Sequence, residues 1–189
     1  FSFTRTHAII GHKNAIEIQE RRDMNLIAAA DENWAIGKDG GLLAHLPGDM
    51  KFFRETTKGR VVVMGRRTLE SFPGGKPLKN RVNVVLTKSG LSAPEDVVIC
   101  RSVEETLEYL TQYGNDDIFI IGGGMIYREF LPYCKKAYIT HIFKAFPADT
   151  ALPDLDKEPG WRLARVLGEG EDHGIRYEFR LYEQMGGTR

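Results

Sequence analysis

Short runs of apolar and β-branched residues recur along the chain, and they limit its fold more than any other feature. Several runs are continuous rather than alternating, as in residues 61–64 and 118–121, which is typical of strands covered on both faces. The runs occupy residues 26–30, 61–64, 82–86, 97–99, 118–121 and 137–143. We therefore expect a mostly parallel sheet with helices on its faces.

Segments with helical signals separate these runs. Pro47 and Asp49 lie near the start of the first segment, where a fixed φ and a negative charge favour a helix N-terminus. Ser102 and Glu105 have the spacing of a capping box at the start of another segment, and Pro132 stops a third. The expected helices span residues 47–57, a short stretch opened by residues 66–68, residues 102–113 and residues 125–131.

The last part of the chain lacks helical signals. After Trp161 it holds only strand-like segments, residues 161–167 and 175–182, joined by a turn rich in Gly and acidic residues. This pattern is typical of a closing β-hairpin. The predicted fold is α/β: a single mostly parallel eight-stranded sheet with a C-terminal antiparallel hairpin, flanked by about four helices.

The domain is expected to begin at Met24. Residues 1–23 contain no long apolar segment with a small-residue cleavage site after it, so they do not resemble a secretory signal. We interpret residues 1–23 as an N-terminal extension, disordered or foreign to the domain. Residues 24–185 form the domain, and residues 186–189 form a flexible C-terminal tail.

Composition excludes several classes of protein. Lys plus Arg (26) equals Asp plus Glu (26), which argues against a basic nucleic-acid binder. Cys100 and Cys134, the two cysteines, give neither a disulfide framework nor a zinc ligand set. No apolar run approaches the roughly 18 residues that span a bilayer. We expect a cytoplasmic protein with no nucleic-acid or membrane partner.

Two strand-to-helix junctions are candidates for anion binding. At the first, Gly65 ends a strand and Arg66 and Arg67 open a helix, whose N–H groups and guanidinium groups would favour phosphate. The alternative is a glycine turn followed by two solvated arginines. At the second, residues 122–124 are consecutive glycines, which we interpret as main chain lying against a ligand, because three glycines cost chain entropy that packing does not require. The alternative there is a plain tight turn.

A third candidate loop follows the strand at residues 82–86. It contains Thr87 and Lys88, which alone are equally typical of an ordinary polar loop. The carboxyl ends of parallel strands share one sheet edge, where ligands bind. Thr87 and Lys88 could therefore join Arg66 and Arg67 around one phosphate of an extended, phosphate-rich cofactor.

Asp49 is an acid in apolar surroundings. On the expected helix it shares a face with Phe52 and Phe53, and Met50 adjoins it. Loss of solvation should raise the pKa of this carboxyl, which suits a group that shares protons or binds the N–H groups of a ligand. The alternative is that Asp49 points into water and complements the helix dipole. His45 could lie at a pocket rim or in a surface turn.

Taken together, the motifs are similar to those of a known family. From Met24 to about Glu183 the chain resembles dihydrofolate reductase of the bacterial chromosomal type. The matching segments, in family order, are LIAAADENWAIG (26–37), LPGDMKFFRETT (46–57), VVVMGRRTLES (61–71), PLKNRVNVVLT (77–87), IIGGGMIY (120–127), AYITHI (137–142) and DTALP (149–153). Several independent motifs in register make this resemblance specific.

The resemblance implies the substrate site. Asp49 stands where the family's ionisable residue binds N3 and the 2-amino group of the pterin, and Thr140 would orient its carboxylate; these are the expected catalytic residues. Arg81 would hold the α-carboxylate of the glutamate tail through two hydrogen bonds. The substrate-binding residues would be Ile27, Ala28, Asp49, Met50, Phe53, Phe72, Lys76, Leu78, Arg81, Ile121, Tyr127 and Thr140.

The resemblance also implies NADPH as the cofactor. The glycines would approach its pyrophosphate, with a cis peptide bond between Gly122 and Gly123, and the basic loops would favour its 2′-phosphate. Residues 31–43 would form a mobile loop over the nicotinamide. The cofactor-binding residues would be Ala29, Ile36, Gly37, Leu42, Gly65, Arg66, Arg67, Thr68, Thr87, Lys88, Ser89, Arg101, Ile121, Gly122, Gly123, Gly124, Met125, Ile126 and Tyr127.

The implied reaction is hydride transfer to C6 of 7,8-dihydrofolate with protonation at N5, in support of one-carbon metabolism and of thymidylate, purine and amino-acid synthesis. The expected partners are dihydrofolate and antifolate inhibitors, bound by a monomer. Leu43 and Ala44 stand where the family often has Pro-Trp, which leaves a smaller wall beside the expected path of the N5 proton.

Two other functions are compatible with part of this pattern. A reductase of riboflavin synthesis shares the fold and cofactor, but it should lack the acid that binds the pterin and the arginine that binds glutamate. A non-catalytic nucleotide-binding module would need none of Asp49, Arg81 and Thr140. The presence of all three favours a dihydrofolate reductase.

Overall fold

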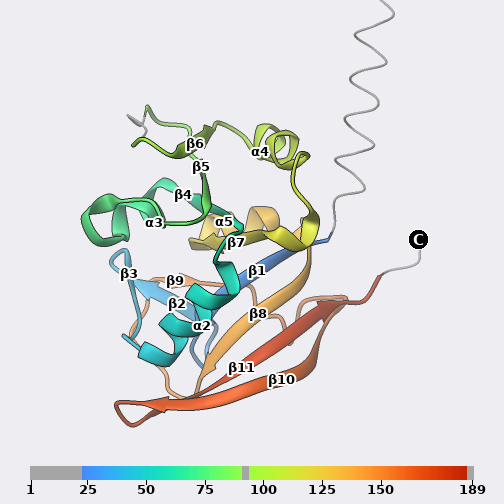
Figure 1. The fold of residues 1–189 in the computed structure, drawn as a ribbon. Helices are drawn as coiled ribbons and strands as arrows, with labels where there is room; N and C mark the ends of the chain where they lie inside the picture. Colours follow the sequence, from blue (N-terminus) through green and yellow to red (C-terminus); the bar gives the residue numbers. More distant parts are fainter. Residues whose placement is uncertain (1–22, 91–93, 187–189) are drawn as a thin grey trace, which may run out of the picture.

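The computed structural model describes residues 23–90 and 94–186, and it is built on an eight-stranded sheet with the strand order β10-β11-β8-β1-β7-β4-β5-β6 (Figure 1). Strands β1 and β4–β8 pair in parallel, and β11 and β10 complete the sheet in antiparallel orientation. The strands are β1 (Met24–Ala30), β4 (Val61–Gly65), β5 (Val82–Leu86), β6 (Val97–Cys100), β7 (Ile118–Gly122), β8 (Cys134–Ile142), β10 (Trp161–Asp172) and β11 (Ile175–Gln184). The predicted fold class is confirmed.

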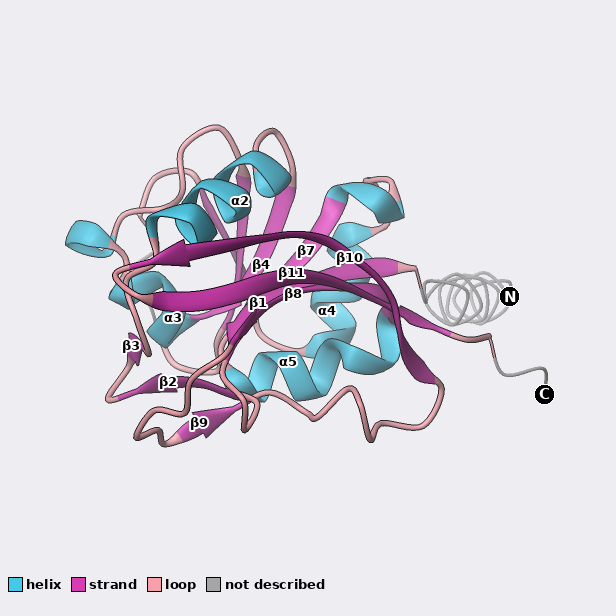
Figure 2. Cartoon of the chain, turned by 90° about the horizontal axis from the view of Figure 1, so that it is seen from below, coloured by secondary structure: helices cyan, strands magenta, loops and turns pink. Residues whose placement is uncertain are grey.

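Helices cover both faces of this sheet, with α2 on one face and α4 and α5 on the other (Figure 2). The helices are α2 (Pro47–Thr57), α3 (Arg66–Ser71), α4 (Val103–Leu110) and α5 (Gly124–Phe130), with 3-10 turns at η1 (Pro73–Gly75), η2 (Asn115–Asp117) and η3 (Leu131–Tyr133). Ser102 caps α4 by accepting from the Glu105 N–H, as predicted. The Glu105 carboxylate, however, accepts from the Arg101 N–H, one residue before the position that a capping box requires.

The two faces of the sheet form separate cores, which explains why its strands are continuously apolar. Leu26 and Ile120 pack on one face with Ile126 of α5. Their strand neighbours Ile27 and Ile121 pack on the other face in a second cluster. This second cluster also includes Phe52, Phe53, Phe72 and Leu78, which approach it from α2 and from the segment around α3.

A second, three-stranded sheet was not predicted from the sequence. It is formed by β2 (Ala35–Lys38), β3 (Gly41–Leu42) and β9 (Thr150–Ala151). Asp39 and Gly40 join β2 to β3 with φ angles of 50° and 79°, the two left-handed residues of a type I′ turn. The Asp-Gly pair is the sequence signal for this hairpin, but two-residue strands carry too little apolar pattern to be recognised on their own.

Strand β10 is longer than its predicted range. It continues to Asp172, because the Gly- and acid-rich segment that the sequence predicts as a turn pairs with β11. Asp172 lies opposite Ile175 in this pairing. The turn itself is His173-Gly174, with φ angles of 53° and 75°. The hairpin therefore extends further than the sequence suggests, and its tip carries an acidic residue.

Asp31 joins the end of β1 to two other segments and is fully buried. Its Oδ1 accepts from the N–H groups of Asn33 and Ala35 at 2.8 and 2.9 Å, and its Oδ2 accepts from the Phe146 N–H at 2.9 Å. One side chain thus holds the entry to the small sheet and the segment after β8. The sequence indicated Asp31 merely as the start of a loop.

Replacement of Asp31 by Ala should destabilise the protein, because it leaves backbone N–H groups without their acceptor in a buried site. The expected loss is about 2 kcal/mol in the free energy of unfolding, or roughly 5 °C in melting temperature. Urea denaturation measures it, with the exposed neighbour Glu32→Ala as control. An equal effect of the two substitutions would contradict the anchoring role.

The expected N-terminal extension and most of the expected C-terminal tail, residues 1–22 and 187–189, lie outside the described residues. At the boundary, Asp23 forms an ion pair with Lys135 at 3.4 Å. Among the residues that the structure describes, no helix is long and apolar enough to cross a membrane.

Candidate functional site

The candidate cofactor loops meet at one edge of the large sheet. Gly65 at the end of β4 pairs with Leu86 of β5, which in turn pairs with Cys100 of β6. On the other side of β4, Met64 pairs with Gly122 of β7. The segments that follow these four strands are therefore neighbours, as expected for the carboxyl edge of a parallel sheet.

Gly122 and Gly124 are required by packing within the protein. Gly122 has a φ of +112°, and a Cβ there would lie 2.9 Å from the Tyr127 ring. A Cβ at Gly124 would lie 2.8 Å from Cγ2 of Thr150. The interpretation that packing does not account for the three glycines is therefore wrong for two of them, because α5 and β9 pack against the turn too closely for side chains.

Gly123 differs from its neighbours. A Cβ there would meet the Thr68 hydroxyl at 3.6 Å, an ordinary contact. The turn thus lies against the start of α3, where Thr68 and the arginines follow β4. The peptide bond between Gly122 and Gly123 is cis, as the resemblance implies.

The loop after β5 is held by the residue that follows β6. Thr87 and Ser89 hydroxyls are 3.0 Å apart, and the Arg101 guanidinium donates to the carbonyls of Ser89 and Thr87 at 2.6 and 3.1 Å. Arg66 is paired with Glu70 on α3 at 2.8 Å. Arg101 and Arg66 therefore have protein partners, while Lys88 is exposed at the same edge.

The expected cofactor residues differ widely in their exposure. Leu42 and Met125 are 67% and 64% exposed, and Ile126 is buried in the core beneath Gly65. Gly37 lies in β2, where an added Cβ would be 2.7 Å from the Gly41 carbonyl oxygen. The small sheet thus explains Gly37 without a ligand.

Asp49 lies at the start of α2 with its carboxyl largely removed from solvent. Burial raises the pKa of this carboxyl and the nearby charge of Asp172 raises it further, while a hydrogen bond with the Thr140 hydroxyl acts in the opposite direction. The direction predicted from the sequence is confirmed, with burial as the main cause. Thr140 is buried on β8, where the resemblance expects an orienting residue. His45 is exposed.

An apolar wall lies beside Asp49 on the same face of the sheet. The second core cluster brings together residues from four segments that were expected to line the substrate pocket: Ile27, Phe53, Phe72, Leu78 and Ile121. Tyr127, buried on α5, donates to the Ile27 carbonyl at 2.8 Å. Burial raises the pKa of Tyr127, and the charge of Asp49 adds to the rise.

Arg81 is fixed at the C-terminal end of α2. Its guanidinium donates to the Thr57 hydroxyl at 2.9 Å, to the Lys79 carbonyl at 2.7 Å and to the Arg54 carbonyl at 3.0 Å. A guanidinium has five N–H donors, so two are left for a ligand carboxylate. The Thr57 hydroxyl in turn donates to the Phe53 carbonyl. The sequence indicates Arg81 but not Thr57, whose contact with Arg81 depends on the fold.

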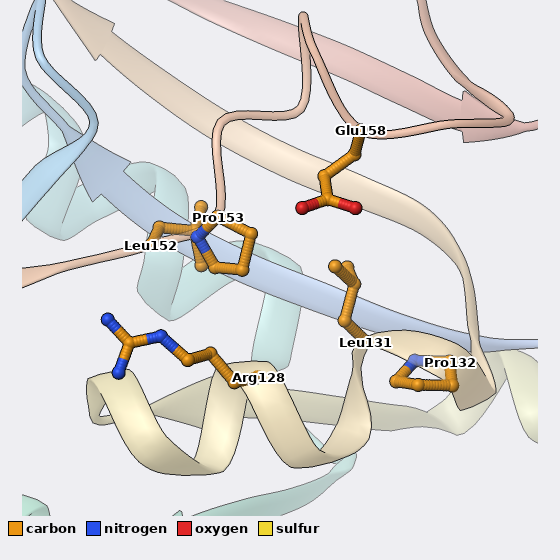
Figure 3. Close-up of a pocket in the computed structure, with 6 residues that line it drawn as sticks. All are labelled: Arg128, Leu131, Pro132, Leu152, Pro153 and Glu158. Atoms are coloured by element: carbon orange, nitrogen blue, oxygen red, sulfur yellow. The ribbon is translucent and has the colours of Figure 1, made fainter.

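A surface pocket of about 410 Å³ lies elsewhere, between the end of α5 and the segment after β9 (Figure 3). It is lined by Arg128, Leu131, Pro132, Leu152, Pro153 and Glu158. Within the described part of the chain, these lining residues are not those that the sequence predicted for substrate or cofactor. The pocket is therefore separate from the candidate site.

The fold and site define an α/β enzyme in which the carboxyl edge of a parallel sheet suits a nucleotide and a largely buried acid lies at the start of α2. A family model described as dihydrofolate reductase matches residues 23–184. The chain belongs to the dihydrofolate reductase family.

Similar proteins include a dihydrofolate reductase of Bacillus subtilis, 34% identical over 88% of this chain and 97% of that protein. A bifunctional dihydrofolate reductase-thymidylate synthase of Daucus carota is 41% identical over 87% of this chain, which spans 34% of that longer protein. Among solved structures, a dihydrofolate reductase from Enterococcus faecalis, complexed with NADP(H) and RAB-propyl, has a TM-score of 0.76 and 34% identity. The match covers 87% of this chain and 97% of that one. The bacterial resemblance and the enzyme class are confirmed.

Proposed function

We propose that the protein catalyses the NADPH-dependent reduction of 7,8-dihydrofolate to 5,6,7,8-tetrahydrofolate, with hydride transfer to C6 and protonation at N5. The observation that carries this proposal is the Asp49 carboxyl, whose burial beside Thr140 raises its pKa. A pterin presents a ring N–H and an amino group that such a carboxyl can bind. The same reaction would support one-carbon metabolism and the synthesis of thymidylate, purines and amino acids.

The residues at the sheet edge fit NADPH. Gly123 lies beside Thr68, and Thr87, Lys88 and Arg67 lie on the loops and helix that follow the adjacent strands. Hydroxyl and basic groups of this kind suit phosphate. When bound, the reduced nicotinamide supplies the hydride.

The chain's own residues hold the substrate and exclude bulk water. Asp49 binds the N3 and 2-amino edge of the pterin, Thr140 fixes the orientation of that carboxyl, and the apolar wall of Ile27 and Phe53 covers the ring. A water delivers the proton to N5, and Asp49 raises the basicity of the pterin. Ala44 stands where the family often has Trp, so the side chain beside this water is smaller.

The direct test is consumption of NADPH that depends on added dihydrofolate, followed by the absorbance of the reduced nicotinamide. We expect tetrahydrofolate as the product and much slower turnover with NADH. NADPH consumption that does not depend on dihydrofolate would contradict the proposal. Reduction of a ribosylated pyrimidine instead would support the riboflavin-type alternative.

Arg81→Lys should raise KM for dihydrofolate while NADPH binding is unchanged, because Lys cannot make the planar two-bond contact with a carboxylate. The expected rise is about tenfold or more, the effect of removing a charged hydrogen bond. Steady-state kinetics measure it. A dihydropterin without the glutamate tail is the control, since parent and variant should reduce it equally. A similar loss with both substrates would show that Arg81 acts through the fold instead.

We also propose that the protein is a monomer in the cytoplasm and that it binds antifolate inhibitors. Both cysteines are free and buried, which suits a reducing compartment. Light scattering in solution tests the monomer, and displacement of dihydrofolate by an antifolate tests inhibitor binding.

A further inference from the structure

The tip of the β10–β11 hairpin contacts the N-terminus of α2, the helix that carries Asp49 (Figure 1). Asp172, the last residue of β10, accepts a hydrogen bond from the Gly48 N–H at 2.8 Å. The same carboxylate oxygen, Oδ2, accepts from the Tyr177 hydroxyl at 2.8 Å. Gly48 immediately precedes Asp49, so a strand more than a hundred residues away in sequence holds the backbone next to the candidate acid.

This contact replaces a local helix cap. The N-cap residue of α2 is Leu46, whose side chain cannot accept a hydrogen bond, and Pro47 has no N–H to satisfy. Gly48 is therefore the first residue of the helix that offers a backbone donor. Asp172 supplies from β10 the acceptor that Ser, Thr, Asp or Asn at the N-cap usually supplies.

Close packing fixes the hairpin tip to α2. A Cβ at Gly48 would overlap the Tyr177 hydroxyl, and a Cβ at Gly170 would lie 2.6 Å from the Tyr177 ring. Tyr177 packs edge-on against Phe179 with ring centroids 5.4 Å apart, and Phe179 stacks on Phe52 of α2 at 4.3 Å. The hairpin thus holds α2 by a polar contact at its start and an aromatic contact one turn later.

The surroundings of Asp172 favour its charged form. The Gly48 N–H and the Tyr177 hydroxyl lower the pKa of Asp172, and the nearby His173 and His45 lower it further. The pKa of Tyr177 is raised to about 12, mainly by burial, so this hydroxyl is neutral near pH 7.

Groups from four elements influence Asp49: Thr140 on β8 by a hydrogen bond, and Asp172 on β10, Tyr177 on β11 and Tyr127 on α5 through charge interactions. The two tyrosines and the threonine are uncharged near neutral pH. Asp172 is therefore the group of this set that carries a charge while Asp49 gains or loses its proton.

We propose that Asp172 is a positioning residue for the reaction: it caps α2 from outside the helix, and it places a negative charge next to the backbone that carries Asp49. The first part concerns the fold, and the second rests on the proposed function. One carboxylate oxygen accepts both hydrogen bonds, and an Asn side chain also has one oxygen. Substitution can therefore separate the effect of the charge from the effect of the helix cap.

Asp172→Asn removes the charge and keeps an oxygen that can accept from Gly48 and Tyr177. Asp172→Ala removes both hydrogen bonds as well. Glu171→Gln is the matched control, since it removes one negative charge from an exposed position on the same strand. The whole protein is used throughout. Three quantities are compared: the NMR titration of the ¹³C-labelled Asp49 carboxyl, hydrogen exchange of the Gly48 amide, and the pH profile of kcat/KM for dihydrofolate.

Asp172→Asn should lower the pKa of Asp49 and shift the corresponding limb of the kcat/KM profile equally toward lower pH. Gly48 exchange should be unchanged in that variant and roughly fivefold faster in Asp172→Ala, as expected for loss of a helix cap. Glu171→Gln should match the parent in all three measurements.

An Asp49 titration that is the same in Asp172→Asn and the parent would overturn the electrostatic part. Unchanged Gly48 exchange in Asp172→Ala would overturn the cap. Should the parent fail to reduce dihydrofolate, the proposed function falls, and the titration and exchange still decide whether Asp172 acts on Asp49.

Discussion

Replacement of Asp49 by Asn is expected to remove most of the turnover with dihydrofolate while NADPH binding is retained. The amide keeps the size of the side chain and can still accept a hydrogen bond from Thr140. It loses the negative charge that binds the pterin and raises its basicity. Loss of a group that takes part in proton transfer lowers rates by about a hundredfold or more. The measurements are kcat/KM at pH 7 and the Kd for NADPH.

Glu55→Gln is the control for Asp49→Asn, because Glu55 is an exposed acid on the same helix, 4.0 Å from Lys51. It should leave both turnover and NADPH binding near the parental values. Parental turnover in Asp49→Asn would contradict the role assigned to the carboxyl, whereas loss of NADPH binding would indicate a wider disturbance of the site.

The same substitution should affect stability in the opposite direction. The pKa of Asp49 is raised in the folded protein, mainly by burial, so ionisation of this group costs stability once the pH exceeds its unfolded value. At neutral pH Asn avoids this cost, and the variant should be more stable than the parent. The difference should vanish as the pH falls below the unfolded pKa of the carboxyl, which thermal melts across pH can follow.

The main sheet could be predicted because its strands are covered on both faces. Residues 61–64 and 118–121 are continuously apolar because alternate side chains enter the two cores. The small sheet could not be predicted in this way, since β3 and β9 are two residues long and are held mainly by backbone pairing. The second half of β10 was missed because its Gly and acidic residues, on an edge strand, resemble a turn.

A site residue could be predicted when its neighbours in sequence also surround it in the fold. Asp49 stands among Phe and Met residues, and the raised pKa follows from that setting. The contacts of Asp172 and Thr57 depend on segments far apart in sequence, so no local pattern reveals them. Gly122 illustrates a different limit of sequence analysis. The run of glycines suggests a ligand, but close packing inside the protein also requires glycine at this position.

Gly122→Ala should be the most destabilising of the substitutions considered. Gly122 has a φ of +112°, which residues with a Cβ rarely adopt, and the new methyl would lie 2.9 Å from the ring of Tyr127. Tyr127 is buried and donates to the Ile27 carbonyl at 2.8 Å, so its displacement would also break a contact between α5 and β1. Backbone strain and overpacking together should cost about 4 kcal/mol, or roughly 10 °C in melting temperature.

Gly90→Ala is the control for Gly122→Ala. A Cβ at Gly90 meets nothing within 4 Å, so that variant should unfold within about 0.5 kcal/mol of the parent in urea. Gly122→Ala,Tyr127→Ala tests the mechanism further, since removal of the ring relieves the overlap and leaves the backbone strain. If the ring is the main obstacle, the Ala substitution at Gly122 should cost less in the Tyr127→Ala background than in the parent. An equal cost in both backgrounds would show that the left-handed backbone, rather than the packing of Tyr127, requires glycine at this position.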